Sequence, residues 1–138
     1  MANAISFIWA LECEALSDNS LRPELRELIV SALVACSPTV GEAQLPYERV
    51  RTFDITGEEG YHYWCKMIWH NYAGAQAAGD SEALESDTAN DRHDWITWAT
   101  AEGRYQRLLE LVESGIAQQH GESRMRAESR KRAGLDVL

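Results

Sequence analysis

The first part of the chain carries apolar residues at steps of three and four, which is the period of an amphipathic helix. Within residues 4–17 these positions are Ile5, Ile8, Trp9, Leu11, Ala15 and Leu16. The spacing predicts a first helix with Glu12 and Glu14 turned towards solvent. The polar run Asp18-Asn19-Ser20 should end this helix.

A second helix is predicted to begin at Pro23, because proline fits the first turn of a helix. Its apolar face comprises Leu25, Leu28, Ile29, Ala32, Leu33 and Cys36. Ser37-Pro38 should stop it, and residues 38–56 are predicted to be irregular. Within that segment, residues 47–55 fit a short strand and a short helix equally.

A third helix is predicted from about Gly57 to Ala78, because Thr56 and Glu59 have the spacing of a capping box. Its predicted core face comprises Tyr61, Trp64, Cys65, Ile68 and Tyr72. Tyr63 and Trp69 lie off this face, so we expect them to be partly exposed. An exposed aromatic side chain beside acidic residues is typical of a protein-binding hot spot.

The rest of the chain predicts two further helices. Asp80 or Ser81 can cap a fourth element, which continues into the apolar residues around Trp95. A fifth helix is predicted from Ala101 to Gln119, with Gly121 as its stop. The sequence therefore predicts an all-α domain over residues 1–121, with four to five helices in a compact bundle or orthogonal array. Residues 122–138 form a basic tail, expected as a helical extension or as disordered chain.

Charge is unevenly distributed along the 138 residues, whose net charge is −9. Residues 1–121 hold 8 Lys and Arg against 19 Asp and Glu, whereas residues 122–138 hold 5 against 3. An acidic body repels nucleic acid and anionic membranes and attracts basic protein surfaces. Only the tail is expected to reach nucleic acid.

The start of the chain is expected to be neither a signal peptide nor a membrane span, because no Lys or Arg precedes its apolar run and acidic residues soon interrupt it. The cysteines Cys13, Cys36 and Cys65 are odd in number and widely spaced, which argues against a disulfide framework or a zinc ribbon. We therefore expect reduced thiols and a cytoplasmic protein.

The carboxylates of residues 80–94 are the strongest candidate for chemistry. Glu82-x-x-Glu85 and Asp91-x-x-Asp94 place side chains three apart on one helix face, where four carboxylates can hold Mg²⁺. This pattern resembles the paired motifs of all-α nucleotide pyrophosphatases, and the resemblance implies a Mg²⁺-dependent nucleotide hydrolase. Only five residues separate the two halves here, and Glu24-x-x-Glu27 could supply the first half instead.

Other metal motifs are incomplete. Glu59 and His62 have the E-x-x-H spacing of di-iron bundles, but no second E-x-x-H occurs in the chain. His93-Asp94 is the dipeptide of metal-dependent phosphohydrolases of the HD type, which need further ligands. No phosphate-binding loop or serine nucleophile motif is present. We therefore expect no cofactor, and no metal site outside the carboxylate pairs.

These features favour a non-enzymatic protein that docks on a basic surface of another protein. The predicted partner-binding residues are Glu82, Glu85, Asp87, Asp91 and Asp94, with Trp69 or Trp95 as the anchor. In size, charge and lack of catalytic motifs the chain resembles small phage or mobile-element inhibitors of host defence, including anti-CRISPR proteins. That resemblance implies a nucleic-acid-handling complex as the target. A phage assembly component, which self-associates through residues 122–138, is a further alternative.

Overall fold

The computed structural model describes residues 4–36, 57–79, 88–132 and 134. The helices in these ranges are α1 (Ala4–Ser17), α2 (Pro23–Cys36), α4 (Gly57–Gly79), α5 (Thr88–Ala99), α6 (Arg104–Glu113) and α7 (Ile116–Arg132). No strand occurs among the described residues, so the predicted all-α class is confirmed. The predicted irregular segment 38–56 and residues 80–87 lie outside the described ranges.

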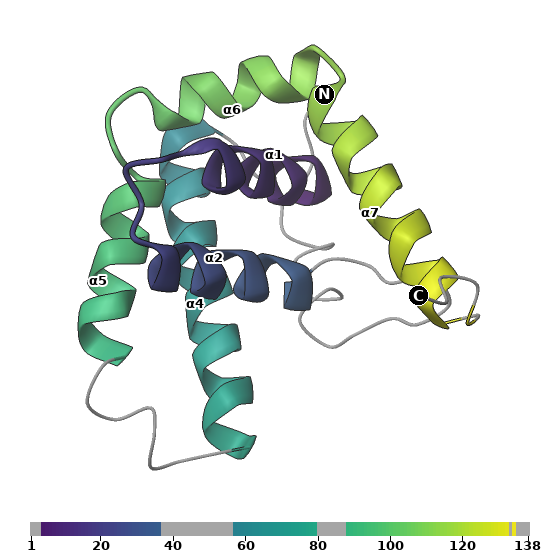
Figure 1. Ribbon diagram of the computed structural model, residues 1–138. Coiled ribbons are helices and arrows are strands. Elements are labelled where there is room, and N and C mark those ends of the chain that lie inside the picture. Colours follow the sequence, from purple (N-terminus) through teal and green to yellow (C-terminus); the bar gives the residue numbers. More distant parts are fainter. Residues whose placement is uncertain (1–3, 37–56, 80–87, 133, 135–138) are drawn as a thin grey trace.

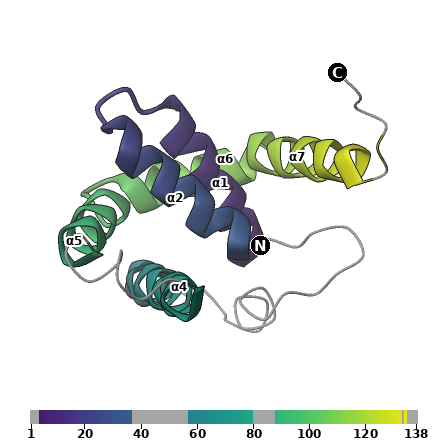
Figure 2. The same cartoon turned by 60° about the horizontal axis from the view of Figure 1, so that its bottom comes forward.

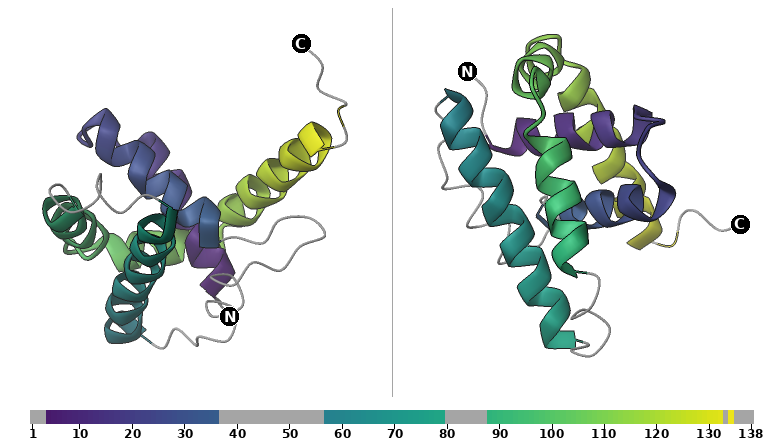
Figure 3. Two further views of the ribbon diagram at one scale, coloured as in Figure 1. Left: turned by 90° about the horizontal axis from the view of Figure 1, so that it is seen from below. Right: turned by 90° about the vertical axis from the view of Figure 1, so that its left-hand side faces the viewer.

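The helices form an orthogonal array, one of the two arrangements predicted (Figures 1 and 3). α1 and α2 run side by side in opposite directions, and α4 and α5 form a second pair that crosses them (Figures 1 and 3). α6 lies across one end of the array, and α7 packs against α1 and α6 on the side opposite α5 (Figures 1 and 2). None of the described helices is long and apolar enough to cross a membrane.

α1 is the central element of the array, because it packs against α2, α6 and α7. Its buried residues cover more than half of the helix circumference: Ala4, Phe7, Ile8, Ala10, Leu11, Glu12, Glu14 and Ala15. The prediction that Glu12 and Glu14 face solvent is therefore wrong. The part of α1 that is not buried is the stripe that includes Ile5, Trp9, Cys13 and Leu16, and both glutamates lie outside it.

The predicted core face of α4 is confirmed, since Tyr61, Trp64, Cys65, Ile68 and Tyr72 are all buried. Phe7 of α1 stacks on Tyr105 of α6, with ring centroids 5.6 Å apart and planes 7° from parallel. Tyr61 contacts both of these rings, and its hydroxyl donates a 2.7 Å hydrogen bond to the carbonyl of Ala99. The buried phenol is thus paired, as a polar group in a core must be.

The predicted fifth helix, Ala101 to Gln119, is wrong in its bounds. The helix is interrupted at Ser114-Gly115. A separate helix, α7, follows and continues through Gly121. Gly115 has φ +82°, a left-handed conformation that glycine adopts without steric cost and that ends α6. Gly121 is buried in mid-helix against Trp9, so the predicted stop there is wrong. Residues 122–132 are helical, which agrees with one of the two alternatives predicted for the tail.

Candidate functional site

The acidic residues predicted to bind a partner are only partly within the described structure. Glu82, Glu85 and Asp87 lie outside the described residues. Asp91 and Asp94 lie on α5, in its first and second turns, and face the start of α2. The α2–α5 contact therefore positions the part of the predicted site that can be described.

Both aspartates bind Arg22, which immediately precedes α2. The Arg22 guanidinium NH2 lies 2.6 Å from Asp91 Oδ1 and 3.4 Å from Asp94 Oδ2. The side chain of Asp94 is 44% exposed and that of Asp91 is 17% exposed, so both carboxylates remain accessible to water. An ion pair this exposed contributes at most about 1 kcal/mol to stability. A competing cation can therefore displace Arg22 at little cost.

A surface pocket of about 560 Å³ opens at this contact; we call it the α2–α5 pocket. Its lining residues are Arg22, Glu24, Leu28, Asn90, Asp91 and Asp94. Three carboxylates thus surround one guanidinium, which leaves the pocket with an excess of negative charge. A pocket with this charge attracts cations.

The predicted aromatic anchors are not on the surface. Trp69 is 2% exposed and Trp95 is 0% exposed, and their rings stack with centroids 6.0 Å apart. The indole N–H of Trp95 donates a 3.3 Å hydrogen bond to the carbonyl of Cys65. The prediction that either indole is exposed is wrong, because α2 and α5 both pack on α4 and cover more than one of its faces.

The metal motifs do not form a metal centre in the described part of the chain. His62 faces Glu58, with Nε2 3.7 Å from Oε1, and His93 is exposed on α5. No group of three or more His, Cys, Asp or Glu side chains close enough to hold a metal ion occurs among the described residues. At the Asp91–Asp94 pair, Arg22 supplies the positive charge.

Sequence reasoning missed a buried charged cluster on α1. Glu12 is 1% exposed, and its Oε2 lies 3.0 Å from His120 Nε2 and 2.8 Å from Arg124 Nε, both on α7. The Arg124 N–H is not aligned for a hydrogen bond, so this contact is an ion pair. Burial raises the pKa of Glu12 above its ordinary value, and Arg124 and His120 only partly oppose the shift.

Glu14, 4% exposed, is held in the same way by α6. It accepts hydrogen bonds from Arg104 and from Arg107, whose Nε lies 2.6 Å from Oε1. The Arg104 guanidinium also lies over the Trp98 ring, 4.4 Å from its centroid, as a cation–π contact. Glu12 thus binds basic residues of α7, and Glu14 binds basic residues of α6. The signal in the sequence was the spacing of those basic residues, 104/107 and 120/124, one helical turn apart.

Asp18 joins the end of α1 to α5 and α6. Its carboxylate accepts hydrogen bonds from the Ser20 N–H at 2.9 Å and from the Trp98 indole N–H at 2.8 Å, and Arg104 lies 3.5 Å away. Hydrogen bonds from Ser20 and Trp98 lower the pKa of Asp18 to about 2. The predicted helix stop at Asp18 is therefore also a junction between helices.

The three cysteines are free thiols. Burial raises the pKa of Cys36 and of Cys65 to about 12, and that of Cys13 to about 11. A thiol with so high a pKa is a poor nucleophile at neutral pH, because the thiolate is the reactive form. These side chains contribute packing.

The α2–α5 pocket is thus the accessible part of the predicted site, and the charged cluster on α1 is internal. Compared with known proteins, the chain matches no family model, no curated protein and no solved structure.

Proposed function

We propose that the protein is a non-enzymatic, cytoplasmic binding protein that docks the α2–α5 pocket on a basic surface of another protein. The observation that supports this proposal is the pocket's composition. Glu24 from α2 and Asp91 and Asp94 from α5 surround it, opposed by one guanidinium. Carboxylates contributed by two packed helices are held at defined positions, which suits recognition of a basic side chain.

The charge of the whole body favours the same class of partner. Residues 1–121 carry 19 acidic against 8 basic side chains, so a basic protein surface is attracted over distances near the Debye length, about 8 Å in physiological salt. Large basic surfaces commonly belong to proteins that bind nucleic acid. The partner class we propose is therefore a nucleic-acid-handling complex, and the role is inhibition by imitation of phosphates, as in anti-CRISPR-like inhibitors.

Docking at the pocket would exchange one cation for another. A Lys or Arg of the partner enters between α2 and α5 and competes with Arg22 for Asp91 and Asp94. Because Trp69 and Trp95 are buried, charge rather than an aromatic anchor provides most of the specificity. Binding should therefore be fast and strongly weakened by salt.

The proposal is tested by affinity capture of the tagged protein from a bacterial lysate, with washes at low and then high salt. The Glu24→Lys/Asp94→Lys variant should retain less than about a tenth of the partner, as expected when close charges are reversed. The matched control, Glu102→Lys/Glu113→Lys, changes the net charge equally at exposed positions of the loop before α6 and of α6, and should retain most of it. Equal loss in both variants, or retention in both, would contradict docking at the pocket.

A Mg²⁺-dependent nucleotide hydrolase is the second candidate, and one observation favours it. Glu24, from the Glu24-x-x-Glu27 pair, lines the same pocket as Asp91 and Asp94, so the two motif halves come from two packed helices. Saturable Mg²⁺ binding and nucleoside triphosphate turnover, both lost in Glu24→Gln/Asp91→Asn, would establish this function. Failure to bind Mg²⁺ at millimolar concentration would exclude it.

A further inference from the structure

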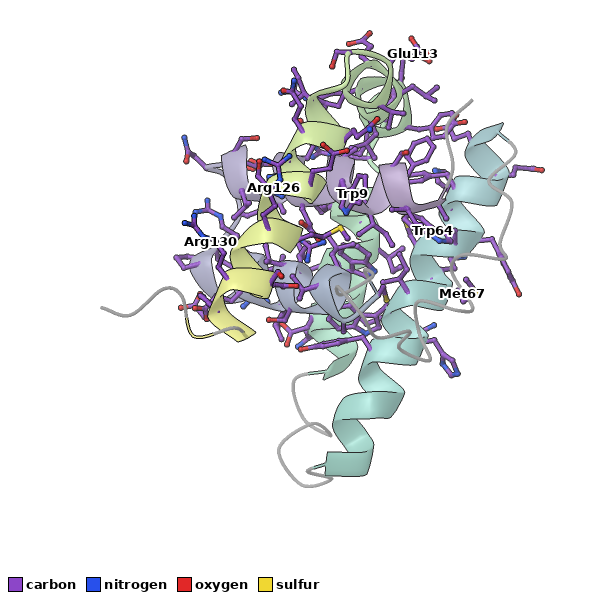
Figure 4. The ribbon with its side chains drawn as sticks, turned by 90° about the vertical axis from the view of Figure 1, so that its right-hand side faces the viewer. Trp9, Trp64, Met67, Glu113, Arg126 and Arg130 are labelled. Atoms are coloured by element: carbon purple, nitrogen blue, oxygen red, sulfur yellow. The ribbon has the colours of Figure 1, made fainter. Side chains whose placement is uncertain are left out.

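α7 docks on α1 through small residues and charge, with little apolar surface. The fully buried residues among the described side chains of α7 are Ala117 and Gly121. Trp9 of α1 lies against Gly121 so closely that a Cβ at this position would overlap the indole atoms Cδ2, Cε2 and Cγ (Figure 4). The contact therefore fits one register of α7 only.

The charges in this contact determine which helix can dock on α1, and they add less to the stability of the docked state. Glu12 lies within 3.0 Å of His120 and 2.8 Å of Arg124. The raised pKa of Glu12 indicates that its ionised form is not fully compensated by these two cations. Replacing either side by a like charge would, however, leave uncompensated charges in the contact, which is far more costly. α1 thus accepts only a helix that carries the charges and small residues of α7.

The connection between α6 and α7 is a hinge at a single residue. Ser114 already has helical angles, φ −74° and ψ −13°, whereas Gly115 has φ +82°. A Cβ at Gly115 would meet no atom within 4 Å, so only the backbone angle separates this residue from a helical one. If Gly115 became helical, α6 and α7 would join into one helix from Arg104 to Arg132, about 43 Å long at 1.5 Å per residue.

We infer that α7 is exchangeable, and that two copies of the chain form a reciprocal dimer in which α7 of each copy docks on α1 of the other. The contacts of α7 with α1 are identical in the monomer and in this dimer. The two states then differ in the hinge angle at Gly115, in the contacts between α6 and α7, which a straight helix loses, and in the entropy of association. A straight helix 104–132 carries α7 away from its own α1 and presents it to a second copy.

Charge-reversal complementation tests this inference. In Glu12→Lys, the introduced lysine faces the basic α7, and in His120→Glu/Arg124→Glu, the acidic α7 faces Glu12. Neither variant can dock α7 within one copy or between identical copies. A 1:1 mixture can form a dimer in which both contacts pair opposite charges.

Light scattering after size exclusion should therefore show monomers for each variant alone and a mixed dimer for the mixture. A mixture that stays monomeric, while far-ultraviolet circular dichroism shows wild-type helix content in both variants, would overturn the inference.

The hinge gives a second test that leaves the contact unchanged. Gly115→Ala disfavours φ +82° and should raise the dimer association constant at least about tenfold, since each dimer contains two hinges. Gly115→Asn is the matched control, because asparagine tolerates this conformation, and its association constant should stay within about threefold of wild type. An unchanged dimer fraction in Gly115→Ala would overturn exchange through this hinge.

Discussion

At the scale of single residues, the positions of Glu12 and Glu14 show what a periodic pattern can and cannot predict. The apolar spacing correctly predicted α1 and its end at Ser17. The spacing could not predict that α2, α6 and α7 pack against this helix, because burial depends on elements distant in sequence. The acidic residues of this apolar helix were therefore assigned to solvent. The matching basic pairs, Arg104/Arg107 and His120/Arg124, decide for burial.

Glu12 gives a prediction for the pH dependence of stability. Because burial raises its pKa above 4.5, the folded state holds the proton more tightly than the unfolded chain. Its contribution to stability is then complete below about pH 4.5 and is lost as the pH rises through the raised pKa. As the pH rises from 4.5 to 7, the Glu12→Gln variant should therefore become more stable relative to the chain that has Glu12.

Urea unfolding at both pH values measures this difference. Both chains should carry His120→Gln, so that the comparison reports on Glu12 and Arg124 alone. A relative loss of stability in Glu12→Gln at pH 7 would mean that pairing with Arg124 outweighs burial, contrary to the account.

At the scale of helices, two glycines have opposite roles that the sequence does not distinguish. Gly115 is open to solvent on its Cβ side and ends α6, whereas Gly121 lies under Trp9 within α7. Gly115 was predicted to lie within the fifth helix, and Gly121 was predicted to be its stop. The difference comes from tertiary packing, since Trp9 is more than a hundred residues away in the chain.

Gly121→Ala should detach α7 from α1. The added methyl group overlaps the Trp9 indole, and such overpacking costs about 1–3 kcal/mol. The higher helix propensity of alanine, about 1 kcal/mol, should keep α7 helical while it is undocked. Hydrogen exchange should speed up at least about tenfold over residues 116–132, with residues 57–72 unchanged. Ser123→Ala, at an exposed position of α7, is the control; similar rates in both variants would contradict the assigned contact.

At the scale of the whole molecule, charge is separated between two sides of the array. α5 and the start of α2, whose residues line the α2–α5 pocket, lie on the side opposite α7 (Figure 1). The exposed positions of α7 include Arg126, which is labelled in Figure 4, and Lys131. The acidic body and basic tail were predictable from composition. The position of Arg22 between Asp91 and Asp94 was not, because it depends on how α2 crosses α5.

Arg22 allows the proposed docking site to be tested by a gain of binding. If a partner cation enters the α2–α5 pocket, Arg22 competes with it, and Arg22→Ala removes the competitor. Lys66→Ala, at an exposed position of α4, removes the same charge elsewhere and serves as the control. The equilibrium dissociation constant for the captured partner is measured by calorimetry at low salt. It should be up to about fivefold lower for Arg22→Ala than for the wild-type chain. It should change little in Lys66→Ala. Weaker binding by Arg22→Ala, or an effect no larger than that of the control, would contradict docking at this pocket.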